Sequence, residues 1–100
     1  MQTYITLMNM TEQGIKDIKN APERTTKSIK QLEEMGGKLI AFYMCMGEYD
    51  YVGISEAPSA EVAMTFLMAL GAGGNVRTTT LRAFSNEEVM GLIGNLPLLP

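Results

Sequence analysis

The chain has 100 residues, which is enough for one domain with a modest hydrophobic core. Its formal net charge of −3 and its lack of a lysine or arginine block argue against a nucleic-acid partner. No apolar stretch approaches the roughly 20 residues of a membrane-spanning helix, so no membrane partner is expected. Cys45 is the single cysteine, which excludes an internal disulfide bond. The single cysteine fits a reducing compartment, and the sequence shows no signal-peptide pattern. We therefore predict a cytoplasmic protein.

The first predicted unit is a strand followed by a helix. Side chains alternate over residues 3–8, which places Ile5 and Leu7 on one face of the strand. Thr11 is a good N-cap for the helix, Pro22 interrupts the helix, and Gly36-Gly37 ends it. One apolar stripe of this helix is expected to be buried, and it comprises Ile15, Ile18, Ile29, Leu32 and Met35.

The next predicted unit is a hairpin, with strands at 38–46 and 49–56. A two-residue loop that begins with Gly47 favours a type II′ turn, because glycine adopts positive φ at little cost. This register pairs Met44 with Tyr51 and places Phe42 over Gly53. Strict alternation puts Leu39, Ala41 and Tyr43 on one face, and Ile40, Phe42 and Met44 on the other. Neither face is polar, so both sides of the hairpin are expected to be covered.

A second helix is predicted over 60–70, with Ser59 as its cap. Glu61 and Thr65 are its only polar residues, and a helix that is apolar nearly all round is usually buried. A partner chain is the expected cover. A flexible glycine-rich loop at 71–75, a last strand at 76–84 and a short helix capped by Ser85 follow. We divide the chain into a domain at 1–90 and an apolar tail at 91–100, expected to lie across a neighbouring subunit.

The element order βαββαβ predicts an α+β protein of the ferredoxin-like type, with an added C-terminal helix. Right-handed crossovers give a four-stranded antiparallel sheet in the order 4-1-3-2. The helices of such a fold cover one face of the sheet, and the other face of this sheet is also apolar. We therefore expect a homo-oligomer in which two sheets pack face to face as a dimeric α/β barrel.

This topology gathers scattered polar residues at one end of the sheet. They are Asn9, Thr11, Tyr49, Asp50, Asn75 and Arg77. Asp50 has two interpretations. In the structural one, its carboxylate caps backbone N–H groups or pairs with Arg77. In the functional one, Asp50, Tyr49 and Arg77 bind a small polar or zwitterionic ligand at a subunit boundary.

The residue types of this chain give little reason to expect a metal or a cofactor. The chain has no histidine, so it lacks an imidazole ligand and a general base that titrates near neutrality. Gly71-x-Gly73-Gly74 precedes a strand instead of opening a helix, which argues against a phosphate-binding loop. We expect no cofactor and no metal, and the residues leave open whether the protein is an enzyme.

Several motifs carry a resemblance to a known family. They are Met1-x-x-Tyr4, Thr11-x-Gln13-Gly14, Gly36-Gly37-Lys38, Gly47-Glu48-Tyr49-Asp50, Glu56-Ala57-Pro58 and Gly74-Asn75-Val76-Arg77-Thr78-x-Thr80-x-Arg82-Ala83-Phe84. Together they resemble the GYD-domain family of small bacterial and archaeal proteins. The resemblance implies a dimeric α/β-barrel architecture, names no activity, and runs from Met1 to about Glu88.

Two wider resemblances imply different functions. The hairpin turn and the Arg77 strand are similar to the effector-binding domain of leucine-responsive regulators, which implies a stand-alone sensor for a small polar ligand. The barrel is also similar to that of antibiotic-biosynthesis-type monooxygenases, which implies a cofactor-independent enzyme. We favour a homo-oligomeric small-molecule-binding or sensor-like module with its site at the Asp50/Arg77 end. The monooxygenase-like enzyme is the alternative, and the absence of histidine counts against it.

Overall fold

The elements follow one another in the predicted order in the computed structural model, which describes residues 1–100. They are β1 (Gln2–Met10), α1 (Glu12–Lys16), the 3₁₀ helix η1 (Ile18–Asn20), α2 (Ala21–Glu34), β2 (Lys38–Met44), β3 (Tyr51–Ala57), α3 (Ala60–Ala72), β4 (Val76–Ala83) and α4 (Asn86–Gly94). The sheet order is β2-β3-β1-β4, with all neighbours antiparallel. The predicted ferredoxin-like α+β fold is confirmed.

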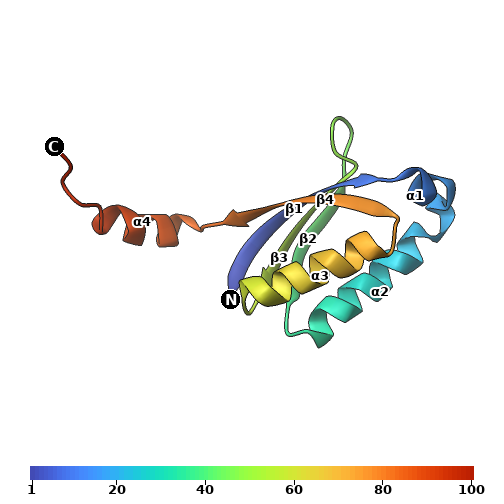
Figure 1. Cartoon of the computed structure of the whole chain (residues 1–100), viewed down its shortest axis with the longest axis horizontal. Helices are drawn as coiled ribbons and strands as arrows, with labels where there is room; N and C mark the ends of the chain where they lie inside the picture. Colours follow the sequence, from blue (N-terminus) through green and yellow to red (C-terminus); the bar gives the residue numbers. More distant parts are fainter.

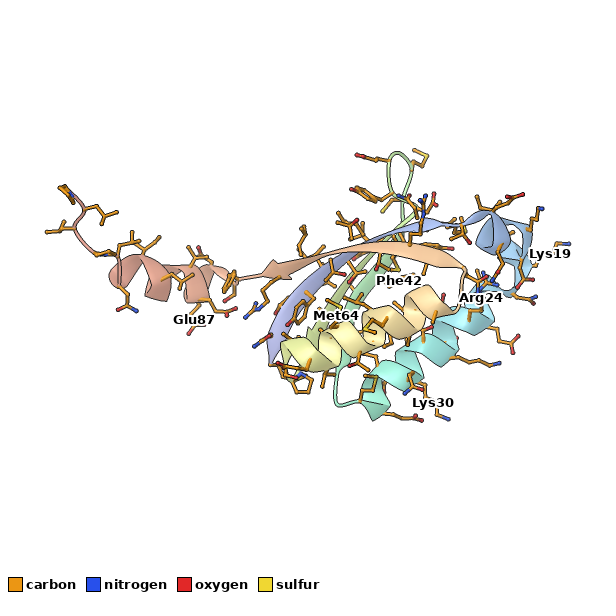
Figure 2. All side chains as sticks on the ribbon, viewed as in Figure 1. Lys19, Arg24, Lys30, Phe42, Met64 and Glu87 are labelled. Atoms are coloured by element: carbon orange, nitrogen blue, oxygen red, sulfur yellow. The ribbon has the colours of Figure 1, made fainter.

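Helices α2 and α3 lie on one face of the sheet (Figure 1). Strand β1 shows this directly, because Tyr4, Thr6 and Met8 are buried while their neighbours are only half-buried. Lys30 on α2 points away from the sheet, whereas Phe42 points between the sheet and the helices (Figure 2). Tyr4 packs with Ala57 and Ala63 in the best-buried cluster, which joins β1, β3 and α3.

The core of a single chain is small. Only eight of the 100 residues are buried, and no large side chain is fully enclosed. Leu32 is buried on α2 as predicted, but Ile15 and Ile18 are 54% and 41% exposed. The prediction that these two isoleucines begin the buried stripe is therefore wrong. They belong to α1 and η1, two short helices that precede α2, so one helical stripe does not run through all three.

The hairpin has the predicted register but not the predicted turn. Met44 pairs with Tyr51 and Phe42 with Gly53, and a Cβ on Gly53 would lie 3.6 Å from the Phe42 ring. The last backbone hydrogen bond runs from Cys45 N–H to Asp50 C=O, at 2.8 Å. Beyond it, residues 45–50 form an open loop in which Gly47 has φ of 109°. The prediction of a two-residue type II′ turn is wrong, although Gly47 takes positive φ as expected.

A β-bulge changes which face part of β2 presents. Leu39 pairs with Ser55 and Ala41 with Ile54, so Ile40 is the extra residue. The bulge breaks strict alternation. Leu39 therefore lies on the helix side with Phe42, and the prediction that it shares a face with Ala41 and Tyr43 is wrong. Tyr43 is 63% exposed on the opposite face.

Helix α4 projects away from the rest of the molecule (Figure 1). Its start is well fixed, because the Ser85 hydroxyl accepts from Glu88 N–H at 3.1 Å and the Glu88 carboxylate accepts from Ser85 N–H at 3.0 Å. Arg82 connects this first turn to the sheet: it lies 3.5 Å from Glu88 and packs over the rings of Tyr4 and Phe84. The remaining surface of α4 and the tail is apolar and exposed, at Met90, Leu92, Ile93, Leu96, Leu98 and Leu99.

None of the helices combines the length and the apolar composition that crossing a membrane requires.

Candidate functional site

The predicted polar end of the sheet exists, and Asp50 has a structural partner there. The Asp50 carboxylate Oδ2 accepts a hydrogen bond from Met10 N–H at 2.8 Å, and Asp50 N–H donates to Met8 C=O at 2.9 Å. These two bonds fasten the base of loop 45–50 to the end of β1. Of the two forms of the structural interpretation, the geometry shows the capping of a backbone N–H. The other carboxylate oxygen, Oδ1, makes no hydrogen bond within the chain.

Thr11 and Asn75 lie together and form a clasp between α1 and the end of α3. Thr11 caps α1 by accepting from Gly14 N–H, and its hydroxyl donates to Gly74 C=O at 2.6 Å. Thr11 N–H donates to Asn75 C=O at 3.0 Å, and the Gln13 amide donates to Asn75 Oδ1 at 3.1 Å. The glycine-rich segment is thus held by several hydrogen bonds, and α3 extends into it as far as Ala72. The prediction of a flexible loop at 71–75 is wrong.

Asn9 and Arg77 are paired neighbours at the end of the sheet face that no helix covers. Arg77 is exposed and Tyr49 is half-buried. The ion pairs of the structure are Lys16–Glu12, Arg24–Asp17, Lys27–Glu23 and Arg82–Glu88. The predicted alternative of an Asp50–Arg77 ion pair is therefore not formed, and Arg77 makes no ion pair within the chain.

Loop 45–50 rises above the sheet on the side opposite the helices (Figure 1). Met46 at its tip is 99% exposed, next to the exposed Glu48. The Cys45–Asp50 hydrogen bond closes its base, and the Asp50–Met10 hydrogen bond ties that base to β1. An apolar tip on an anchored base is a feature that recognition surfaces use. Sequence reasoning missed this loop because it assumed the tightest turn.

The sheet face opposite the helices carries two rows of side chains that pass from strand to strand. One row is Ala41, Ile54, Ile5 and Leu81, and the next is Tyr43, Val52, Leu7 and Thr79. Leu81 is 50% exposed. This open sheet face, defined by these eight residues, is apolar apart from Thr79 and the Tyr43 hydroxyl, as the sequence predicted.

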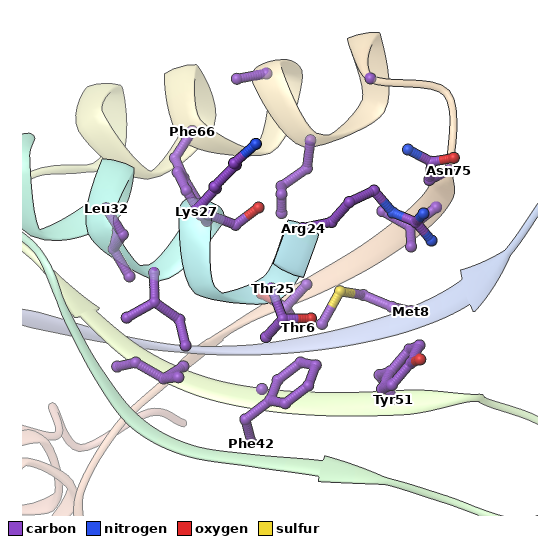
Figure 3. Close-up of a pocket in the computed structure, with 18 of the residues that line it drawn as sticks. Thr6, Met8, Arg24, Thr25, Lys27, Leu32, Phe42, Tyr51, Phe66 and Asn75 are labelled. Carbon is purple, nitrogen blue, oxygen red and sulfur yellow. The ribbon is translucent and has the colours of Figure 1, made fainter. Parts of the chain in front are cut away.

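A cavity of about 320 Å³ lies between the helices and the sheet and is partly open to solvent (Figure 3). Its floor includes the stacked rings of Phe42 and Tyr51, whose centroids lie 5.2 Å apart. Leu32 on α2 and Phe66 on α3 contribute to the wall. Because the cavity is partly open, solvent or a ligand is expected to fill it.

The charged residues that line the cavity are both basic, Arg24 and Lys27. No carboxylate and no thiol lines it, and the structure contains no cluster of potential metal ligands. Sequence reasoning missed this cavity. Leu32 was predicted to be buried and Phe42 to lie over Gly53, but a filled core and a hollow one have the same hydrophobic pattern. The bulge that turns Leu39 inward also had no sequence signal.

The sequence matches the GYD domain over residues 4–93. The chain belongs to the GYD family. A relative from Thermus thermophilus is 33% identical over 91 residues, which span 90% of this chain and 96% of that protein. That protein is named a glutamine synthetase and cystathionine beta-lyase binding protein. The suspected family is thus confirmed. One relative of this GYD protein is named for the two enzymes that it binds.

The solved structure of the leucine response regulatory protein LrpA from Mycobacterium tuberculosis is also similar. Its TM-score is 0.56 at 18% identity, and the match covers 85% of this chain but 51% of the regulator. The chain therefore spans about half the length of that protein. At this identity the likeness shows the fold alone. It agrees with the ferredoxin-like arrangement of the sheet and helices.

Proposed function

We propose that this GYD protein is a homo-oligomeric, sensor-like binding module of the cytoplasm. Copies associate through the open sheet face, and the Asp50/Arg77 end with loop 45–50 recognises a partner protein and a small polar ligand. The observation that carries the proposal is the open sheet face itself, because two adjacent rows of largely apolar side chains have no cover within the chain. Exposed apolar patches of this kind mark interaction sites.

Self-association accounts for the small core of one chain. Seventeen large hydrophobic side chains are exposed, including Leu81 and Tyr43 on the open sheet face. Packing two such faces would bury mainly apolar surface, since the two rows hold only one phenol and one threonine. This supports the dimeric α/β barrel as the assembly. The apolar tail at 91–100 would lie across the neighbouring subunit.

The recognition surface is proposed at the same end of the sheet as Tyr49, Asp50 and Arg77. Arg77 is exposed and has no ion-pair partner, and Asp50 Oδ1 remains open to a donor. An amino acid could thus meet a positive and a negative group at one place. Asn9 borders the proposed recognition surface. Thr11 and Asn75 support this surface through the clasp between α1 and the end of α3. Met46 on the loop above would supply the apolar contact with a partner protein.

The name of the Thermus relative suggests the partner class. We propose that glutamine synthetase or cystathionine beta-lyase of the same organism binds this chain. Biolayer interferometry with the immobilised protein and each purified enzyme tests this directly. We expect micromolar or tighter binding to at least one enzyme, and at least a tenfold loss in Met46→Ser.

Met64→Ser is the matched control, because Met64 is also an exposed methionine, at 58%, but lies on α3. It should leave binding unchanged. Failure of both enzymes to bind would refute the proposed partner, and equal losses in the two variants would refute loop 45–50 as the contact. A thermal-shift screen with amino acids tests the ligand part: Arg77→Gln should abolish stabilisation that the wild type shows.

A further inference from the structure

We propose that the cavity between α2, α3 and the sheet binds a small apolar carboxylate, held by Arg24. This cavity lies on the helix side of the sheet, whereas Arg77 lies on the open sheet face; Asn75 borders both, and the proposal does not depend on the partner protein proposed above. Three observations support it: the size of the cavity, the position of the Arg24 guanidinium at one end of it, and the sign of its charges.

The size suits a compact ligand. Ligand cavities commonly begin at about 300 Å³, and a cavity of about 150 Å³ accommodates benzene. A volume of about 320 Å³ therefore suits a molecule of roughly ten to twelve non-hydrogen atoms. Thr25, Ser28 and Ser55 also line the cavity.

The Arg24 guanidinium lies at one end of the cavity (Figure 3). The Arg24 guanidinium extends toward Asn75, at the end where Tyr51 also lies, and Leu32 lies at the opposite end. Apolar side chains line the space between, including Phe42 and Phe66. An amphiphile with one polar head and a short apolar chain matches this arrangement.

Arg24 determines which charge the head group of the ligand should carry. Its Nη1 atom donates to Asp17 Oδ2 at 2.7 Å and to Asp17 C=O at 2.9 Å, which fixes the side chain. Its Nε and Nη2 groups make no hydrogen bond within the chain, and the side chain is 27% exposed. A guanidinium fixed on one edge and free on the other is suited to bind a carboxylate. Lys27 also lines the cavity, but its ammonium pairs with Glu23 at 3.1 Å on the surface, so Arg24 is the group that would hold the head.

Isothermal titration with octanoate, octan-1-ol and octylamine tests the site, since these probes share a chain and differ in the head group. We expect octanoate to bind with a dissociation constant on the order of 0.1 mM, and octylamine at least tenfold more weakly. Arg24→Gln should weaken octanoate binding at least tenfold and leave octan-1-ol unchanged. Arg24→Lys should restore part of the affinity, and Lys30→Gln on the outer side of α2 should have no effect.

A second variant keeps the test valid if the loss of the Arg24–Asp17 pair destabilises the fold. Ser55→Leu places three additional carbon atoms into the cavity from β3, so it should abolish binding of all three probes while the protein stays folded. Octanoate binding no tighter than octylamine binding would overturn the proposal. Unchanged octanoate binding in either Arg24→Gln or Ser55→Leu would also overturn it.

Discussion

Asp50 fastens the hairpin loop to the central strand, because its carboxylate accepts the Met10 N–H at 2.8 Å. Its own N–H donates to Met8 C=O at 2.9 Å. Asp50 is therefore part of the sheet framework. Any ligand role must use the carboxylate oxygen that this bond leaves free.

Replacing Asp50 should lower stability whether or not a ligand is present. A hydrogen bond between a charged and a neutral group contributes about 1.5–3 kcal/mol, so Asp50→Ala should reduce the free energy of unfolding by that amount. Asp50→Asn keeps an acceptor and should lose less. Urea denaturation measures both. Glu48→Ala in the same loop is the control, and an Asp50→Ala loss no larger than that of the control would show that the bond contributes little.

Gly14 is required by its distance from Asn75. A Cβ on Gly14 would lie 2.1 Å from Asn75 C=O, which is backbone and cannot move aside alone. Gly14→Ala should therefore separate α1 from the end of α3 and cost about 3 kcal/mol. Thermal unfolding checks this.

Gly71→Ala is the matched control for this clasp. Nothing lies within 4 Å of a Cβ on Gly71, and the residue is in α3, where alanine is the better helix former. It should leave stability unchanged or raise it by up to about 1 kcal/mol. Similar melting temperatures for Gly14→Ala and Gly71→Ala would mean that the clasp is not formed.

Helix α4 should lose stability in acid. The Ser85 N–H that donates to the Glu88 carboxylate lowers the pKa of Glu88, and the Ser85 hydroxyl and Arg82 lower this pKa further. Because the pKa is lower in the folded state, the stabilisation is fully present above the ordinary glutamate pKa of about 4.3 and is lost as the pH falls through the lower folded value. Backbone chemical shifts of α4 during a pH titration measure this.

Glu88→Gln should flatten the pH dependence of α4, whereas Glu87→Gln should retain it. Glu87 also lies in the first turn of the helix but takes no part in the capping box. An equal response of the two variants would indicate that only the helix dipole acts on these carboxylates, and not the hydrogen bond to Ser85.

Sequence reasoning succeeded where the deciding interactions are local. The alternation at Ile5 and Leu7, the caps at Thr11, Ser59 and Ser85, and the fit of Phe42 over Gly53 each depend on a few neighbouring residues. Crossover handedness then gives the strand order without further information. The fold follows from these features.

The errors arose where distant contacts decide. The open loop 45–50 depends on β1, because Asp50 bonds to Met8 and Met10 and the ladder with the Cys45 side of the hairpin ends at Asp50. The bulge at Ile40 and the packing of residues 73–75 on α1 likewise depend on partners far along the chain. The cavity has no sequence signal of its own, because it reflects how far two helices stand from a sheet.

The most direct test of the central claim is the mass of the protein in dilute solution. Sedimentation equilibrium of the wild type at micromolar concentration should give twice the mass of one chain or a higher multiple. Leu81→Lys, which places a charge on the open sheet face, should shift the equilibrium to the monomer, while Gln31→Lys on the exposed side of α2 should not. A wild-type mass of a single chain would contradict association through the open sheet face and the binding module built on it.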